Sequence, residues 1–152
     1  MKVAIASDHA GYRLKELLKQ TLEELQLDYE DLGTFDETSV DYPDYGAKVA
    51  KGVADGLYDR GVLVCGTGLG MAITANKVKG VRAVTAHDVF SAKMSRMHND
   101  ANVLTMGERV IGQGAAAEVL KAWLTTEFEG GGMPSASPRW PTSNGSRCNE
   151  QA

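Results

Sequence analysis

A thiol, a hydroxyl and three glycines lie close together at residues 65–70, which read Cys-Gly-Thr-Gly-Leu-Gly. The apolar run 62–64 before them is typical of a buried strand, and residues 71–77 after them indicate a helix. Glycines let a ligand approach the backbone, and the free N–H groups of a first helical turn attract anions. The segment therefore predicts an anion-binding loop with a thiol at the carboxyl end of a strand, where open α/β sheets bind ligands.

Taken alone, this segment also fits less specific interpretations. The glycines could form a tight turn between a strand and a helix, and Cys65 could be a small buried side chain. Their spacing differs from the dinucleotide-binding pattern Gly-x-Gly-x-x-Gly, and the Gly-Lys-Ser/Thr of a P-loop does not follow. The functional interpretation therefore depends on which other polar residues accompany the thiol.

Other polar residues stand at the ends of predicted strands. Asp8 and His9 follow the first strand, and each also has a simpler role, as a helix N-cap and as an exposed loop residue. His98 and Asn99 precede the last strand, where a helix C-terminus and a turn would explain them equally well. Arg109 follows that strand and could be a surface charge. The functional case rests on the joint occurrence of all five.

Strand and helix patterns alternate along the chain and must position these side chains. One helix, for example, carries an apolar stripe of five leucines, Leu14, Leu17, Leu18, Leu22 and Leu25. The alternation predicts an α/β protein of the three-layer, Rossmann-like class, in which a five-stranded parallel sheet has helices on both faces. We expect strands at 2–6, 28–32, 60–64, 80–85 and 103–106, and helices at 12–27, 44–56, 71–77, 88–96 and 115–127.

Length, charge and cysteine usage limit the possible classes. A chain of 152 residues is expected to form one main domain. The formal net charge of −4 argues against a partner that is a nucleic acid or an anionic membrane. Cys65 and Cys148 show neither disulfide nor metal-site spacing, and no apolar run approaches about 18 residues. We therefore expect a cytoplasmic protein with no membrane segment.

Several of these segments together resemble the type B ribose-5-phosphate isomerase family, whose relatives isomerise galactose 6-phosphate and allose 6-phosphate. The resemblance covers residues 1–131 almost without a gap. It is much more specific than any single motif. The segments that carry it are 7–11, 41–43, 65–70, 75–77, 80–83, 95–104, 107–112 and 128–131.

The resemblance implies an enzyme, an aldose–ketose isomerase that interconverts ribose 5-phosphate and ribulose 5-phosphate through a cis-enediolate. Such a reaction moves a proton between C1 and C2. It needs a base, a group that helps to open the sugar ring, hydrogen-bond donors for the developing oxyanion, and groups that bind the phosphate. It implies no metal and no organic cofactor. The family's sites lie between two subunits, so the resemblance also implies a homodimer or a tetramer.

The resemblance also implies roles for the residues at matching positions. Cys65 matches the proton-abstracting thiol, and a helix N-terminus beside it favours the thiolate. Relatives without this cysteine carry a glutamate where this chain has Met71, which places the chain in the cysteine-using group. Tyr42 could cover the ligand or pack against the fold. The remaining matches are the supporting hydroxyl Thr67; the ring-opening acid/base His98; the ring-oxygen or hydroxyl contact Asp8; the enediolate and hydroxyl donors Gly66, Gly68, Leu69, Gly70 and Asn99; and the phosphate contacts His9 and Arg109.

The chain departs from the family after Gly131. The family continues Arg-His-x-x-Arg-Val, and both arginines hold the phosphate, whereas this chain has Gly132 and Ala136 at those positions. Residues 132–152 are rich in proline and serine and show no periodicity. We therefore expect residues 1–131 to form the isomerase domain and 132–152 a loosely attached tail, with a weakened phosphate grip and retained chemistry.

A shifted reading frame would account for this tail. Met133 is encoded by ATG and Trp140 by TGG, and reading one base earlier lets residues 131–133 encode Arg-His. Permissive third bases then give Ala, Ile or Leu, Arg, Val, Ala, Lys, Met, Ala, Asp, Ile and Glu, which restores Arg-His-x-x-Arg-Val before a helical sequence. We hypothesise that the tail is a frameshifted version of the family terminus. A genuinely divergent tail is the alternative.

Two other functions also fit the sequence. The substrate could be another sugar phosphate, such as galactose 6-phosphate, allose 6-phosphate or a tetrose phosphate, because the loop 33–45 and the tail would set that choice. A non-catalytic sugar-phosphate-binding subunit is the second alternative. The presence of all four residues implied in the chemistry, Cys65, Thr67, His98 and Asp8, argues against it.

Overall fold

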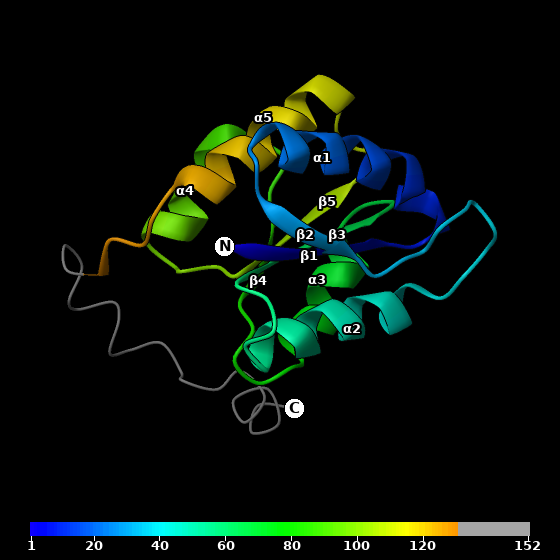
Figure 1. Cartoon of the computed structure of the whole chain (residues 1–152), viewed down its shortest axis with the longest axis horizontal. Helices are drawn as coiled ribbons and strands as arrows, with labels where there is room; N and C mark the ends of the chain where they lie inside the picture. Colours follow the sequence, from blue (N-terminus) through cyan, green and yellow to red (C-terminus); the bar gives the residue numbers. More distant parts are fainter. Residues whose placement is uncertain (131–152) are drawn as a thin grey trace.

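Five parallel strands form the central sheet of the computed structural model, which describes residues 1–130 (Figure 1). The strand order is β2-β1-β3-β5-β4. The predicted Rossmann-like class and all five strands are confirmed, whereas the predicted tail 132–152 lies outside the described residues. The strands are β1 (Lys2–Ser7), β2 (Asp28–Asp31), β3 (Arg60–Cys65), β4 (Ala83–Thr85) and β5 (Val103–Gly107).

Helices cover both faces of the sheet and complete the three layers. Figure 1 shows α1, α4 and α5 above the sheet and α2 and α3 below it. Side chains alternate accordingly along β1: Val3 and Ile5 belong to the apolar cluster under α1 and α5, and Ala4 and Ala6 to the cluster on α2 and α3. The helices are α1 (Tyr12–Glu24), α2 (Tyr42–Ala54), α3 (Leu69–Asn76), α4 (Val89–Met97) and α5 (Gln113–Thr125), and a short 3-10 turn, η1 (His9–Gly11), precedes α1.

The helices differ from their predicted bounds at their ends. The stripe predicted for α1 is correct, since Leu14, Leu18 and Leu22 are fully buried. The helix nevertheless stops at Glu24, because Gln26 adopts a positive φ of 58°. Such a left-handed residue closes a helix C-terminus.

The connections after β1 and β3 leave the sheet on opposite faces. β1 continues through η1 into α1 on one face, and β3 continues into α3 on the other. The two strands are neighbours, with Ser7 in register with Val64 at their carboxyl ends. This divergence opens a crevice at a topological switch point, where ligands of open α/β sheets bind.

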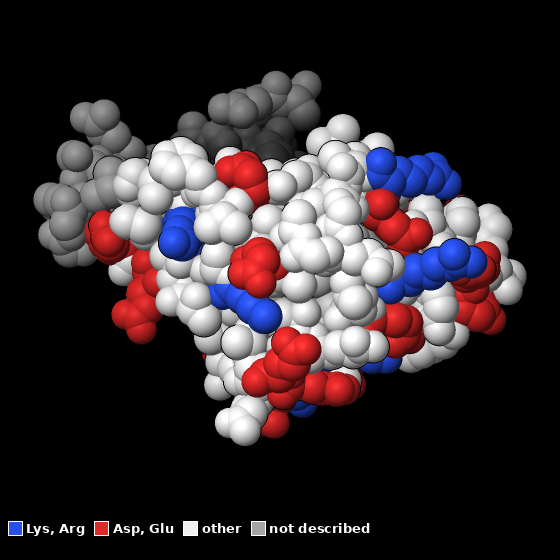
Figure 2. Space-filling model, turned by 90° about the horizontal axis from the view of Figure 1, so that it is seen from above, with Lys and Arg blue, Asp and Glu red and all other residues white. Residues whose placement is uncertain are grey.

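Charges are mixed on the face formed by α1 and α5. Figure 2 shows acidic and basic side chains interspersed among apolar and neutral ones over the described part of this face. This distribution agrees with the argument from net charge against a nucleic-acid surface. Among residues 1–130, none of the helices is both long and apolar enough to cross a membrane.

Candidate active site

A pocket of about 380 Å³ opens at the switch point between the ends of β1 and β3. A larger open groove of about 600 Å³ runs along α2, but it lies away from the thiol and is lined by such residues as Asp44, Lys48 and Lys51. The smaller pocket is the better candidate for the active site, because Cys65 is among its lining residues. Its lining consists of predicted site residues together with Ala10, which the sequence argument did not single out: Asp8, His9, Ala10, Tyr42, Cys65, Gly66, Thr67, Gly70 and Arg109.

Cys65 lies at the bottom of this pocket, where β3 ends. Its side chain is buried, with 5% exposure, and its Sγ accepts a hydrogen bond of 3.1 Å from the Gly68 N–H. Gly68 is the N-cap of α3 and has a φ of 83°, a left-handed conformation that favours glycine. Leu69 donates its N–H to the Thr67 hydroxyl at 3.2 Å. The sulfur therefore accepts one amide hydrogen bond beside the N-terminus of α3, and both place partial positive charge near it.

Large side chains lie directly on two glycines of the loop. A Cβ added to Gly70 would lie 2.6 Å from the Tyr42 ring, and one added to Gly66 would lie 3.3 Å from the Arg109 guanidinium. Tyr42 therefore packs against the loop and also lines the pocket, so both roles considered for it are present in the structure. Arg109 reaches over the loop from the turn after β5 and supplies a cation at the pocket wall.

Asp8 and His9 reach the pocket from the turn after β1. Asp8 is a helix cap, because its Oδ1 accepts a hydrogen bond of 3.1 Å from the Gly11 N–H, and it lines the pocket as well. His9 accepts the Val40 N–H at Nδ1, at 3.1 Å. A neutral imidazole that accepts at Nδ1 carries its proton on Nε2. His9 is thereby prepared to donate to a phosphate or hydroxyl oxygen.

Glu108 links the loop after β5 to the start of α1, and its role could not be recognised from the sequence. Its Oε1 accepts the Leu14 N–H at 2.7 Å. Gly11, the N-cap of α1, has no side chain to satisfy the free amides of the first turn. Glu108 supplies this cap from the loop that carries Arg109 and so fixes that loop against the first turn of α1, which directly follows η1.

Removing the Glu108 carboxylate is expected to destabilise the fold. We expect Glu108→Ala to lower the free energy of unfolding by about 1 kcal/mol, the usual cost of a lost N-cap. Denaturant titration of the purified protein measures this. Glu108→Gln keeps an acceptor oxygen and is the matched control, expected to retain most of the stability. Equal losses in the two variants would show that the hydrogen bond to Leu14 is not responsible.

A second unpredicted contact holds the turn after β5. The Gly107 N–H donates to His87 Nε2 at 2.8 Å. Burial of the ring lowers the pKa of His87 below its usual value of 6.5, and the carboxylate of the adjacent Asp88 only partly opposes this shift. The neutral ring is therefore the native form, since protonation at Nε2 would remove the acceptor for Gly107.

The lowered pKa of His87 predicts that acid weakens the fold. As pH falls below about 6.5, the unfolded chain binds a proton at His87 before the folded chain does, so unfolding becomes more favourable. Stability from this residue is complete above about pH 6.5 and is lost as pH falls toward the lowered pKa. Melting temperatures measured between neutral and mildly acidic pH should fall less in His87→Gln, which cannot titrate. Identical pH profiles for the two proteins would contradict this expectation.

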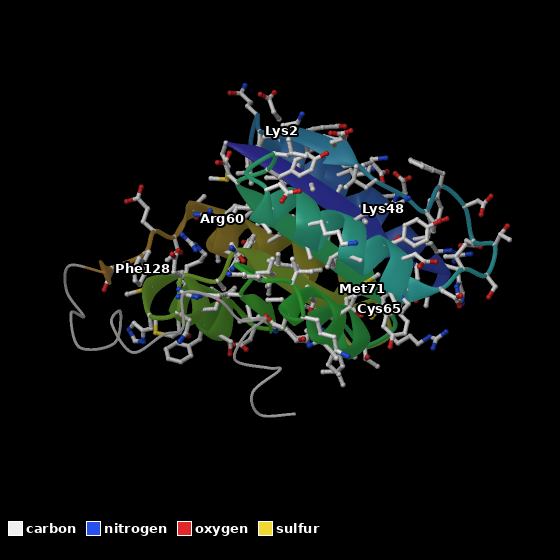
Figure 3. The ribbon with its side chains drawn as sticks, turned by 90° about the horizontal axis from the view of Figure 1, so that it is seen from below. Lys2, Lys48, Arg60, Cys65, Met71 and Phe128 are labelled. Atoms are coloured by element: carbon white, nitrogen blue, oxygen red, sulfur yellow. The ribbon has the colours of Figure 1, made fainter. Side chains whose placement is uncertain are left out.

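His98 and Asn99 lie at the amino ends of the strands, whereas Cys65 lies at a carboxyl end. Helix α4 starts beyond the carboxyl end of β4 and runs back, so that both residues precede the amino end of β5. Glu129 donates its N–H to the last carbonyl of α4, and Figure 3 shows its neighbour Phe128 far from Cys65. The structure of one chain therefore does not bring these two predicted site residues into the pocket.

The turn that carries His98 is firmly held in this place. Arg96 is almost fully buried, and its Nη1 donates to Asp100 Oδ1 at 2.9 Å and to the Ala101 carbonyl at 2.6 Å. These bonds tie the end of α4 to the residues that follow the turn. A local movement of the turn would not carry the imidazole across the sheet to Cys65.

Comparisons with known proteins show the family to which this chain belongs. The family described as Ribose/Galactose Isomerase matches residues 3–137. This chain belongs to that family. It is also 59% identical over 132 residues to the Bacillus subtilis protein named "Putative sugar phosphate isomerase YwlF", with 86% of this chain and 89% of that protein covered.

Two further relatives are named for different sugar phosphates. Ribose-5-P isomerase B of Listeria innocua is 48% identical over 131 residues, with 86% of this chain and 88% of that protein covered. D-erythrulose-4-phosphate isomerase 2 of Mycolicibacterium smegmatis is 48% identical over 133 residues, with coverages of 85% and 87%. Among solved structures, ribose-5-phosphate isomerase B of Clostridium thermocellum superposes with a TM-score of 0.90 at 43% identity, and the match covers all of both chains. The chain is thus a sugar phosphate isomerase of this family.

Proposed function

We propose that this protein interconverts ribose 5-phosphate and ribulose 5-phosphate, with Cys65 as the base. The observation that carries the proposal is the placement of the Cys65 sulfur beside the Gly68 amide in a pocket shared with Asp8, His9 and Arg109. These residues would supply a base, hydrogen-bond donors for an oxyanion and two side chains, one of them cationic, that can bind a phosphate in a pocket of about 380 Å³. No group of three His, Cys, Asp or Glu side chains within residues 1–130 has a metal-binding arrangement.

The proposed reaction begins with the open-chain aldose. The Cys65 thiolate takes the proton from C2, and the electron pair moves toward the C1 carbonyl oxygen to give a cis-enediolate. The amides of residues 66–70 stabilise the negative charge on that oxygen. The thiol then returns the proton to C1, and the proton of the C2 hydroxyl passes to the C1 oxygen, so that C2 becomes the ketone carbon and C1 carries a hydroxyl group. His9 and Arg109 hold the phosphate, and Asp8 contacts the ring oxygen or a sugar hydroxyl.

An isomerase assay with purified protein tests the substrate assignment. We expect ribose 5-phosphate to be converted to ribulose 5-phosphate, with rates measured over a wide range of substrate concentration. D-erythrulose 4-phosphate is the second substrate to assay, because relatives named for the two reactions are equally similar to this chain, at 48% identity. Higher kcat/KM for the tetrose phosphate, or for a hexose 6-phosphate, would reassign the substrate within the family.

We further propose that the active form is a two-fold dimer whose sites combine Cys65 of one subunit with His98 of the other. The separation of the two residues within one chain supports this arrangement, because a ring-opening acid/base must reach the same sugar. Large apolar side chains of α3 and α4 are exposed in the single chain: Leu69 at 59%, Ile73 at 62% and Phe90 at 70%. Exposed apolar surface of this kind commonly marks a protein–protein interface.

Mixing two inactive variants tests the shared site. Cys65→Ala and His98→Asn should each be inactive as a homodimer. After unfolding and refolding in equal amounts, half of the dimers are mixed, and each mixed dimer has one complete site. We therefore expect about a quarter of wild-type activity to return. If both residues acted within one subunit, mixing would restore nothing.

A further inference from the structure

Two threonines of the sheet lie beneath the loop that holds Cys65. Thr105 donates its hydroxyl to the Gly68 carbonyl at 2.8 Å, and the Thr85 and Thr105 hydroxyl oxygens are 2.7 Å apart. Thr85 also reaches the same carbonyl, at 3.4 Å. The two residues are in register on β4 and β5, so their side chains leave the sheet on the same face.

The polar partners of the Thr105 hydroxyl are the Gly68 carbonyl and the Thr85 hydroxyl, in a layer of the sheet that is otherwise apolar. Thr105 has zero exposure and is in register with Leu63, which belongs to the apolar cluster under α2 and α3. Burial of a hydroxyl in such surroundings is unfavourable unless the hydroxyl is hydrogen-bonded, and valine would fill the same volume without that requirement. The interaction with the Gly68 carbonyl therefore accounts for the polar group at this position.

Gly68 is the residue of the loop that most needs an external restraint. Glycine has the greatest backbone freedom of all residues, yet the Gly68 N–H must point at the Cys65 sulfur. The backbone of Met106 approaches from one side, since a Cβ on Gly68 would lie 2.9 Å from it. Thr105 holds the carbonyl of the same residue. The N–H and the carbonyl belong to two peptide planes that meet at the Gly68 Cα, so holding the carbonyl limits the backbone rotations that could turn the N–H away from the sulfur.

We propose that Thr105, supported by Thr85, is a positioning residue that keeps the Gly68 amide directed at the Cys65 sulfur and so stabilises the thiolate. The chemical relevance of the thiolate rests on the function proposed above. The hydrogen bonds to Gly68 do not depend on that proposed function. The reactivity of Cys65 toward an alkylating agent therefore reports on the position of the Gly68 amide without any substrate.

The experiment compares Thr105→Val, which removes the hydroxyl at constant volume, with Thr105→Ser, which keeps it. The alkylation rate of Cys65 by iodoacetamide at neutral pH is followed on the Cys65 peptide by mass spectrometry, which separates it from Cys148. The thiolate is the reactive form, so a displaced amide donor lowers this rate. We expect Thr105→Val to lower both the alkylation rate and kcat by about threefold to tenfold, as for one net hydrogen bond, with KM nearly unchanged. Thr105→Ser should restore both quantities to near the wild-type values.

Ser95→Ala is the matched control, because it also removes a buried hydroxyl that donates to a carbonyl at 2.8 Å, but in α4, away from the thiol. Ser95→Ala should change stability without changing alkylation. If Thr105→Val behaves in the same way, Thr105 is merely structural and the proposal is wrong. If Thr105→Val does not fold, Thr85→Val takes its place and must slow alkylation in the same direction, and an unchanged rate would overturn the proposal.

The thiol readout also separates this proposal from the proposed function. Slower alkylation in Thr105→Val, in a protein whose wild type isomerises no sugar phosphate, would support the positioning role and contradict the assigned reaction. Wild-type isomerase activity that depends on Cys65 but is insensitive to Thr105→Val would support the reaction and contradict the positioning role.

Discussion

Replacement of Cys65 by alanine is expected to abolish isomerisation. A positioned base contributes about 10² to 10⁴ in rate, so kcat should fall by roughly 10³-fold or below detection. The KM for ribose 5-phosphate should change little, because we propose that the phosphate is held by His9 and Arg109, which line the pocket, rather than by the thiol. Initial rates over a range of substrate concentration separate the two quantities.

Two further variants make the Cys65 result specific. Cys65→Ser keeps a side chain of similar size, but its hydroxyl is much less acidic than a thiol, so we expect it to be nearly as inactive as Cys65→Ala. Cys148→Ser should be fully active, because this residue lies in the divergent tail. If Cys65→Ala kept more than about a tenth of the wild-type kcat, the base would have to be another group in the pocket, and Asp8 would be the first to replace.

Much of the pocket could be predicted from the sequence because of the symmetry of parallel sheets. All strands point the same way, so residues that follow strands in the chain meet at one edge of the sheet. Asp8 follows β1, Cys65 ends β3 and Arg109 follows β5, and these three residues line one pocket. The same rule explains why His98 lies outside the pocket: it precedes β5 and is therefore at the amino ends of the strands. Periodicity gave the faces of the strands and helices, although helix ends shifted by a few residues.

The contacts that support the site could not be predicted in this way. Glu108 looks in the sequence like a solvated charge after a strand, and nothing in its neighbours indicates that it caps a helix that begins almost a hundred residues earlier. His87, Thr85 and Thr105 likewise acquire their roles from hydrogen-bond partners on other elements. Such partners depend on the distance and direction between elements, which hydrophobic patterns do not contain. The site residues themselves were identified through the family resemblance, which periodicity could not replace.

The second large effect concerns the phosphate and the divergent tail. The curated relatives compared above align over 131 to 133 residues, and 87 to 89% of each is covered. Each alignment covers 85 to 86% of this chain, so part of the chain lies outside it. The resemblance implies two arginines after Gly131, where this chain has Gly132 and Ala136. A sequence of the gene around codon 131 decides the origin of the tail, since an alternative frame without Arg-His-x-x-Arg would exclude a frameshift.

Without these two arginines, the protein is expected to bind the substrate weakly while the chemical step remains intact. Each charge-assisted contact to the phosphate contributes roughly 1.5 to 3 kcal/mol, so the loss of both should raise KM by about two orders of magnitude or more. The test compares the chain as printed with a second protein whose residues after 131 are translated in the alternative frame. We expect the second protein to have a KM for ribose 5-phosphate about 100-fold lower and a similar kcat, because Cys65 and its loop are identical in both. Free ribose, which has no phosphate, is the control substrate, and its kcat/KM should not distinguish the two proteins. Equal KM values for ribose 5-phosphate would mean that His9 and Arg109 hold the phosphate without help from the terminus.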